Sequence, residues 1–230
     1  MDYLYGDSWE KFPIKDNEVW KAGPNIMVCA DLMDLDASNL KHVFGRDQID
    51  MLYSDPPWNQ GNISTFITKA KLEKKIDYWA FIDHLTKTAK AFRPRFSYLE
   101  GGLKQRAQLV EAINKNLSAP PHIYQIRYYN RHKCLLYRAS TPDSPSPNLT
   151  GLDDTKTPFA AMEFDQPKSA LDLCMGRGGT ARAAHQLGIP CFGVELNKRR
   201  LANLLDFYAQ NGLEPRPIGR VCGEKKDQGA

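Results

Sequence analysis

Hydrophobic residues gather in seven short runs along the chain. The runs cover residues 25–30, 50–54, 95–100, 122–129, 133–139, 169–174 and 190–195. In most of them the apolar residues are continuous rather than alternating with polar ones, which is typical of strands buried on both faces of a parallel sheet. The pattern therefore predicts seven β-strands.

Segments with apolar residues at helical spacing separate these strands. The four clearest segments are 76–92, 103–117, 180–187 and 197–210. Alternation of strand and helix predicts an α/β fold with a mostly parallel, doubly wound sheet. The exception is the pair 122–129 and 133–139, which only three residues separate. We expect this pair to form an antiparallel hairpin.

The segment 139–154 is rich in Pro, Ser and Asp and has no apolar period. Such a composition indicates a flexible surface loop or a boundary between domains. Only residues 155–230 follow it, with two predicted strands, which is too little chain for an independent α/β domain. We therefore expect one domain over 1–230, with both late strands returning to the same sheet.

Composition excludes several classes of protein. The chain has 230 residues, and 31 Lys and Arg against 27 Asp and Glu give a net charge of +4, too small an excess to identify a nucleic-acid binder. No apolar run approaches the ~20 residues that span a bilayer, so we expect no membrane association. Residues 1–12 include acids and no apolar stretch, which predicts no signal peptide.

Four of the five cysteines lie inside apolar runs, and no two cysteines form a C-x-x-C pair. The four are Cys29, Cys134, Cys174 and Cys191. This arrangement indicates buried, reduced thiols and a cytoplasmic location, and it argues against a zinc site.

The sharpest chemical signal is Ser54-Asp55-Pro56-Pro57-Trp58, directly after the predicted strand 50–54. Open α/β sheets bind ligands at the carboxyl ends of their strands. A plain turn would explain Asp and the prolines, but it does not require a large aromatic residue at the fourth position. In a chemical interpretation, Asp55 and the Pro56 carbonyl are acceptors beside the flat face of Trp58. That combination suits an exocyclic amino group on a nucleobase.

A second signal is the glycine-rich stretch 171–180, which reads LDLCMGRGGT after a predicted strand. Alone it could equally be a dinucleotide fingerprint. Glu195 ends the next predicted strand, where an acid would bind ribose hydroxyls of either cofactor class. A dinucleotide domain needs further strand–helix units after this acid, whereas only the helix 197–210 and a tail remain here.

Together, the DPPW residues and the glycine-rich stretch resemble the amino-methyltransferases, which methylate the exocyclic nitrogen of adenine or cytosine. The order, target motif before cofactor motif, is similar to that of the family's circularly permuted class. The resemblance covers about 25–210 and implies a seven-stranded Rossmann-like sheet with an antiparallel edge hairpin. Cys174 and Arg177 depart from the family pattern, which usually has an aromatic and a small residue there. The family's target-recognition domain is also missing, and the loop 139–154 takes its place.

The resemblance also implies roles for particular residues. It makes Asp55, Pro56, Pro57 and Trp58 the catalytic residues. S-adenosylmethionine would be bound by Asp31, Leu32, Asp55, Lys156, Asp172, Cys174, Gly176, Gly178 and Glu195. Asp31 has an equal alternative as the N-cap of the segment after it.

The predicted hairpin interleaves basic and aromatic residues over 127–133. Arg127, Arg131 and Lys133 are therefore candidates for contacts with nucleic acid. The alternative is an edge hairpin kept soluble by its charges.

The function that these observations favour is S-adenosylmethionine-dependent methylation of adenine N6 in DNA. Asp at the first motif position favours adenine by resemblance, whereas cytosine-N4 enzymes more often have Ser. The alternatives are an RNA adenosine-N6 methyltransferase, a cytosine-N4 methyltransferase, or a non-catalytic nucleic-acid-binding subunit. The mechanism requires no metal, and a homodimer or a partner subunit stays open. A dehydrogenase on the same fold would leave the DPPW motif unexplained.

Overall fold

The computed structural model describes residues 7–117, 119–140 and 144–221. The middle of the expected loop, 141–143, lies outside the described residues.

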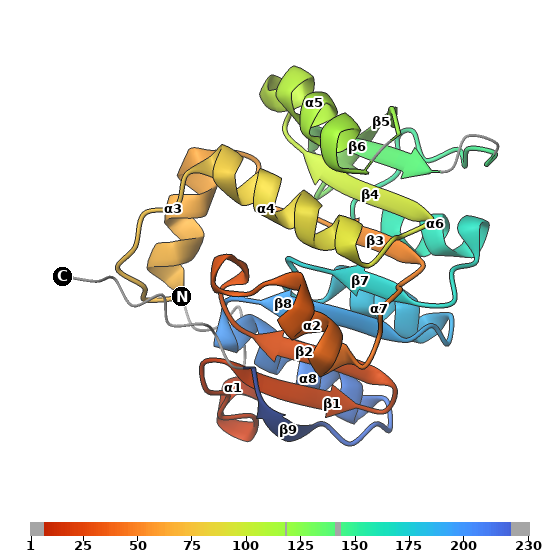
Figure 1. Ribbon diagram of the computed structural model, residues 1–230. Helices are drawn as coiled ribbons and strands as arrows, with labels where there is room; N and C mark the ends of the chain where they lie inside the picture. The colour runs from red at the N-terminus through yellow and green to blue at the C-terminus, as the bar shows by residue number, and fades with distance from the viewer. Residues whose placement is uncertain (1–6, 118, 141–143, 222–230) are drawn as a thin grey trace.

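A nine-stranded sheet with the order β5-β6-β4-β3-β7-β8-β2-β1-β9 forms the centre of the molecule (Figure 1). Its strands are β1 (Glu18–Ala22), β2 (Asn25–Cys29), β3 (Met51–Ser54), β4 (Phe96–Gly101), β5 (His122–Tyr128), β6 (His132–Ser140), β7 (Ala170–Asp172), β8 (Cys191–Glu195) and β9 (Arg216–Arg220). The five central strands, from β4 to β2, pair in parallel. Antiparallel strands close both edges.

The α/β class and the antiparallel edge hairpin are confirmed, and each of the seven predicted strands is present. The count of seven is wrong, because β1 and β9 extend the opposite edge of the sheet. β9 contains Pro217 and Gly219 and is exposed along its whole length. A Pro within a short polar run argues against a strand in the sequence and is tolerated only at a sheet edge, where β9 lies.

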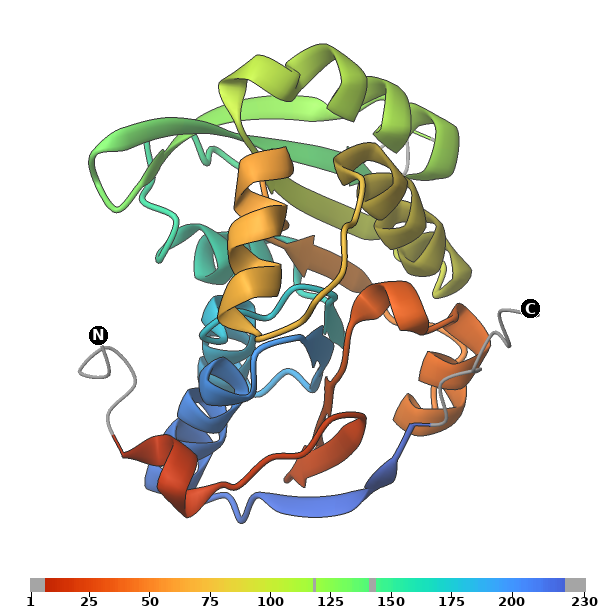
Figure 2. The same cartoon turned by 90° about the vertical axis from the view of Figure 1, so that its left-hand side faces the viewer.

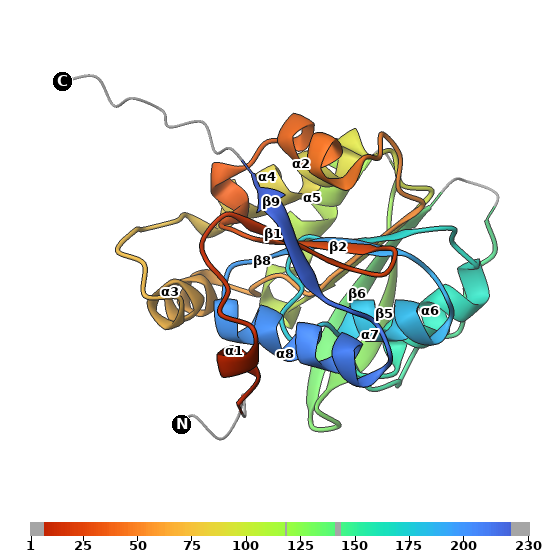
Figure 3. The same cartoon turned by 90° about the horizontal axis from the view of Figure 1, so that it is seen from below.

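Helices cover both faces of the sheet, as the view along it shows (Figure 3). They are α1 (Ser8–Lys11), α2 (Ala37–Phe44), α3 (Gln60–Lys69), α4 (Tyr78–Ala91), α5 (Arg106–Leu117), α6 (Thr157–Asp165), α7 (Gly179–Gln186) and α8 (Lys198–Gln210). α2, α4 and α5 cover one face, and α6, α7 and α8 cover the other. The four helices predicted from spacing are confirmed as α4, α5, α7 and α8.

Alternate residues of each strand point into the two helical layers. Leu52 and Leu99 belong to the apolar cluster beneath α2, α4 and α5. Met51 and Tyr98, one position earlier in each strand, belong to the cluster beneath α6, α7 and α8. With both faces covered, the carboxyl ends of the parallel strands are the edge at which open α/β sheets bind ligands.

The described part of the expected loop packs against the edge hairpin. Leu149 is buried. The Gly151 amide donates to the Gln125 carbonyl at 2.8 Å, and the Arg127 amide donates to the Leu152 carbonyl at 2.8 Å. These bonds hold the segment 149–154 along β5 and bring its acidic end to the hairpin turn.

α3 stands at the side of the molecule that faces the viewer in Figure 2. It follows the DPPW residues, and Asn59 caps it by accepting from the Asn62 amide at 3.0 Å. Ile63 and Ile67 bury one side of the helix. None of the helices in the described ranges has the length and apolar character needed to cross a membrane.

Candidate active site

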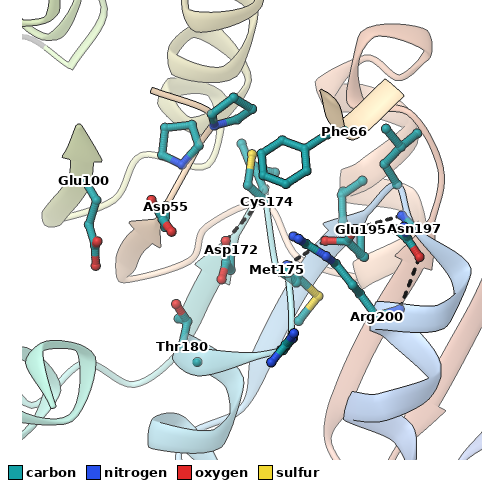
Figure 4. Close-up of a pocket in the computed structure, with 18 of the residues that line it drawn as sticks. Asp55, Phe66, Glu100, Asp172, Cys174, Met175, Thr180, Glu195, Asn197 and Arg200 are labelled. Atoms are coloured by element: carbon teal, nitrogen blue, oxygen red, sulfur yellow. Dashed lines mark hydrogen bonds between the residues drawn. The ribbon is translucent and has the colours of Figure 1, made fainter. Parts of the chain in front are cut away.

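A cavity of about 880 Å³ lies at the carboxyl ends of the parallel strands. Its walls come from the ends of β2, β3, β4, β7 and β8, from α3 and from the hairpin turn. The close-up in Figure 4 shows Asp55 and Glu100 at one end, Glu195 and Arg200 at the other, and Asp172 between them. We call these the Asp55 end and the Glu195 end.

At the Asp55 end, the DPPW turn is held by its own side chains. The Trp58 indole Nε1 donates to Asp55 Oδ1 at 2.8 Å. Asn62, in the first turn of α3, accepts from the Trp58 amide at 3.3 Å. The Trp58 ring meets Tyr128 of the hairpin edge-on, with centroids 4.8 Å apart. The motif thus presents a carboxylate next to an aromatic wall.

The pKa of Asp55 is raised to about 7, chiefly because the cavity walls desolvate its carboxylate, and the charge of Asp172 adds to this. The hydrogen bond from Trp58 favours the charged form and opposes the shift. The side chain nevertheless faces the open cavity and is accessible to solvent. Asp55 can therefore take up and release a proton near neutral pH.

Asp172 links the DPPW strand to the glycine-rich turn. Its Oδ1 accepts from the Ser54 hydroxyl at 3.0 Å and from the Cys174 amide at 3.0 Å. Ser54 Oγ in turn accepts from the Leu173 amide at 2.9 Å. Burial raises the pKa of Asp172 to about 6. This network fixes two sequence-distant segments, near residues 54 and 173, against each other.

At the Glu195 end, the glycine-rich turn wraps around a buried carboxylate. The amides of Gly176 and Asn197 donate to the two oxygens of Glu195 at 2.6 and 2.7 Å. Burial raises the pKa of Glu195 to about 7, and the nearby charge of Arg200 opposes the shift. Each carboxylate oxygen has a second lone pair, so Glu195 can still accept bonds from a ligand.

Two glycines are required in this turn for different reasons. Gly176 (φ 55°) and Gly178 (φ 82°) both adopt the left-handed conformation. A Cβ on Gly178 would lie 2.5 Å from Leu204 Cδ1 of α8. Gly176 lines the cavity, whereas Gly178 lies behind the wall and allows α7 to pack against α8.

Asp31 already has two partners. Its Oδ1 accepts from the Met33 amide at 2.9 Å as the N-cap of a short 3₁₀ helix, Leu32–Asp34, so the N-cap interpretation is confirmed. Its Oδ2 forms an ion pair with Lys74 Nζ at 2.5 Å. Both Asp31 and Leu32 line the cavity.

The structure brings most of the predicted site residues to one cavity. Those that line it are Asp31, Leu32, Asp55, Pro56, Pro57, Trp58, Asp172, Cys174, Gly176 and Glu195. Lys156 is exposed at the start of α6 and does not line it, although its neighbour Thr155 does. Gly178 does not line it either.

The basic residues of the hairpin lie outside the cavity. Arg127, Arg131 and Lys133 are exposed, whereas Tyr128 and Tyr129, within the same segment, line the cavity. Asp153 and Asp154 hold the turn by accepting from the amides of Asn130 and Tyr129. The hairpin thus has aromatic residues in the cavity wall and positive charges on its exposed surface.

Glu100, Phe66 and Arg200 are among the lining residues that the sequence did not predict. Glu100 is the penultimate residue of β4, and the signal for it was an acid inside an apolar run. Phe66 lies on α3, whose sequence QGNISTFITK is poor in strong helix formers. Arg200 of α8 stands 4.8 Å from the centroid of the Phe66 ring, and no sequence signal distinguishes it from its neighbour Arg199.

Comparison of the sequence with profiles of known protein families gives no match. Comparison with curated proteins gives none either.

Solved structures share the fold. M1.HpyAVI matches with a TM-score of 0.57 and 13% identity, over 80% of this chain and 98% of its own. TTHA0409 from Thermus thermophilus, described as a putative DNA modification methylase and complexed with S-adenosyl-L-methionine, matches with 0.55 and 13%, over 76% and 91%. The cytosine-N4-specific PvuII DNA methyltransferase matches with 0.52 and 9%, over 80% and 91%. The chain has the fold that these proteins share.

Proposed function

We propose that this protein is an S-adenosylmethionine-dependent methyltransferase that acts on the exocyclic N6 amine of adenine in DNA. The observation that carries the proposal is the position of Asp55. Its carboxylate, held by Trp58, lies in the same cavity as Glu195 and the glycine-rich turn. A target-amine motif and a cofactor loop that meet in one cavity are what methyl transfer between them requires. The complexes of TTHA0409 and M1.HpyAVI with the same cofactor support the choice of cofactor.

The residues present fit that cofactor. Glu195 would accept from the ribose hydroxyls, and Leu32 and Phe66 give apolar surface for a planar ring. Asp172 and the glycine-rich turn would hold the methionine part. When bound, the cofactor supplies an electrophilic methyl group on a sulfonium.

At the Asp55 end, the chain would activate the amine. An exocyclic amine is a poor nucleophile because its lone pair is delocalised into the ring. Asp55 and the Pro56 carbonyl would accept hydrogen bonds from its two N–H groups, which would favour a tetrahedral nitrogen. The Trp58 side chain would lie against the ring of the base. The amine nitrogen would take the methyl group from the sulfonium, whose S–C bond breaks to leave a neutral thioether. The nitrogen would then lose a proton, which Asp55, with its pKa raised to about 7, can accept.

The identity of the base is a separate part of the proposal. The fold includes the cytosine-N4-specific PvuII enzyme, so cytosine N4 is the second candidate. Adenine is preferred because Asp, rather than Ser, stands at the first position of the motif. RNA is the alternative polymer.

A base in duplex DNA would have to be flipped out to reach Asp55. The exposed Arg127, Arg131 and Lys133 lie on the hairpin whose tyrosines line the cavity, and in this proposal they would contact phosphates around the flipped base. The permuted order of the two motifs belongs to the proposal, as do a homodimer or a partner subunit. So does a cytoplasmic location, with which the free, buried thiols of Cys29, Cys134 and Cys191 agree.

The experiment is incubation of the protein with methyl-labelled cofactor and separate pools of DNA, RNA and buffer alone. We expect label in DNA with the wild-type protein and none with Asp55→Ala, which should still bind cofactor. Label in RNA alone would replace DNA with RNA as the substrate. No label in either pool, from protein shown to bind the cofactor, would contradict the proposed function.

A further inference from the structure

Glu100 is the penultimate residue of β4 and lies next to Asp55. Strands β3 and β4 pair in parallel, with Ser54 opposite Leu99, so Asp55 and Glu100 lie beside each other at the same edge of the sheet. Glu100 is only 3% exposed, and it lines the cavity at the Asp55 end (Figure 4). The proposed amine chemistry assigns it no task.

One oxygen of Glu100 is held and the other is unpartnered. The Tyr53 hydroxyl donates to Oε1 at 2.9 Å. Tyr53 is itself fully buried and stacks on Tyr98, with centroids 5.6 Å apart, so the carboxyl group has a fixed position. Oε2 is buried and has no hydrogen-bond partner in the part of the chain that the structure describes. A buried polar atom without a partner costs free energy, which a ligand can recover.

The surroundings of Glu100 favour its protonated form, which is a hydrogen-bond donor. Burial, and the negative charges of Asp55, Asp154 and Asp172, raise its pKa well above the ordinary value, whereas the hydrogen bond from Tyr53 opposes this shift. Two adjacent carboxyl groups do not both ionise readily, and the indole of Trp58 favours the charge on Asp55. Because Oε1 accepts from Tyr53, the proton of the neutral form belongs on Oε2, the oxygen without a protein partner.

We propose that Glu100 recognises the target base by donating from Oε2 to the unprotonated ring nitrogen beside the target amine. This inference rests on the proposed function and adds a specificity-determining residue to it. In adenine and in cytosine the atom next to the amine-bearing carbon is an acceptor nitrogen. Guanine in the same orientation as adenine has a nitrogen that carries a hydrogen at this position, and a carbonyl oxygen in place of the amine. A donor at this position accepts the first two bases and rejects the third.

The two carboxyl groups at the Asp55 end, which come from neighbouring strands, then have different roles. Asp55 accepts from the amine, and Glu100 donates to the atom beside it. A donor and an acceptor side by side match the acceptor and donor that adenine presents on its pairing edge.

The test is the rate of methyl transfer to two DNA substrates, one with adenine and one with 1-deazaadenine, which has C–H in place of the ring nitrogen, at the methylated position. Wild type, Glu100→Gln and Glu100→Met are compared. Gln keeps a donor, whereas Met has similar length and none. Both remove a desolvated carboxyl group, so we expect both to fold, and thermal unfolding checks this. Calorimetry should give cofactor affinities within about twofold of wild type, because Glu100 lies at the far end from Glu195.

We expect the wild type to prefer adenine over 1-deazaadenine by about 50-fold or more, since a site built to hydrogen-bond rejects an analogue that lacks the partner. Glu100→Gln should keep most of this preference, and Glu100→Met should reduce it to about threefold or less. The same preference in Glu100→Met as in wild type would overturn the inference and leave the proposed function intact. No transfer from wild type to natural DNA would overturn the proposed function, and the inference with it. If the target is cytosine, 3-deazacytosine is the matching analogue.

Discussion

At the scale of single residues, the site depends on acids whose surroundings set their proton affinity. Asp55, Asp172 and Glu195 all have a raised pKa, in each case chiefly through desolvation of the carboxylate, yet their partners differ. Asp172 and Glu195 bond to backbone amides and thereby fix the glycine-rich turn. Asp55 instead accepts from the side chain of Trp58 and faces the open cavity. The accessible acid is the one suited to act on a substrate.

Asp55→Ala should lower the rate of methyl transfer by about 100-fold or more, the usual worth of a positioned acid–base group. Since the pKa of Asp55 is about 7 and its charged form is the acceptor, kcat/KM of the wild type should fall about tenfold per pH unit below pH 7 and level off above it. The measurement is a pH–rate profile over pH 5 to 9.

Asp55→Asn is the matched control for that profile, because Asn keeps the shape and an acceptor oxygen but does not titrate. Its residual activity should be independent of pH over the same range. Trp58→Phe removes the hydrogen bond to Asp55 Oδ1, which favours the charged form of Asp55. In this variant the midpoint of the pH–rate profile should therefore move to higher pH. An acid limb that persists in Asp55→Asn would assign the titration to another group.

At the scale of elements, strands buried in the sheet could be predicted from their apolar runs, whereas the exposed strand at the sheet edge could not. Strands such as β8 and β3 are buried at every position, and their continuous apolar runs located them. β9 could not be predicted, because it is exposed throughout and is defined by pairing with β1, a long-range contact. α3 was missed for a related reason: its sequence lacks strong helix formers, and packing of Ile63 and Ile67 decides its conformation.

The same distinction holds for the candidate site. Asp55 directly follows β3 and Glu195 is the last residue of β8, so predicting where each strand ends also predicted where the residue lies. Phe66 and Arg200 come from helices that fold over the strand ends, and only the tertiary structure shows that they meet. Lys156 was placed by resemblance to a short element, and the structure puts its side chain on the surface.

The Glu195 end should be separable from the Asp55 end by cofactor binding. Glu195→Ala should weaken S-adenosylmethionine binding about tenfold or more, because it removes the acceptor for ribose and loosens the turn held by Gly176. Lys156→Ala is the control and should leave the dissociation constant within about twofold, since Lys156 lies outside the cavity. Isothermal calorimetry measures both. Unchanged affinity in Glu195→Ala, or a thermal shift with NAD alone, would contradict the assigned cofactor site.

The hairpin should contribute to DNA affinity through charge. Replacing Arg127, Arg131 and Lys133 together by Ala should weaken binding and reduce the slope of log K against log salt by about 2 to 3, at about 0.9 per phosphate contact. The control replaces three exposed lysines of α4 and α5, Lys87, Lys90 and Lys115, with the same loss of charge. Equal effects from both sets would mean that net charge, and not the hairpin, attracts DNA.

At the scale of the whole molecule, the sheet explains how distant motifs form one site. The carboxyl ends of parallel strands meet at one edge whatever their order along the chain, so β3 and its DPPW turn lie beside β7 although more than a hundred residues separate them. The hydrogen bond from the Ser54 hydroxyl to Asp172 joins the ends of β3 and β7 directly. A permuted order of motifs is compatible with the same cavity for this reason.

The three acids with a raised pKa also predict how the stability of the ligand-free protein changes with pH. A group with a raised pKa binds its proton more tightly in the folded state, so the free energy of unfolding falls as pH rises from its unfolded value, about 4, to its folded value. For Asp172, Asp55 and Glu195 the folded values are about 6, 7 and 7. The melting temperature should therefore be higher at pH 5 than at pH 8. Glu195→Gln should reduce this difference. A wild-type melting temperature that increases from pH 5 to pH 8 would contradict the prediction.

The proposed activity of the cavity is methyl transfer to the exocyclic amine of adenine in DNA. Mass spectrometry tests it on nucleosides released from DNA of random sequence after incubation with cofactor that carries a deuterated methyl group. We expect deuterated N6-methyldeoxyadenosine with the wild-type protein, and about 100-fold less or lower with Asp55→Ala. Deuterated N4-methyldeoxycytidine would contradict the assignment of the base, and a label on any ring carbon, or none in DNA, would contradict the amine chemistry assigned to Asp55.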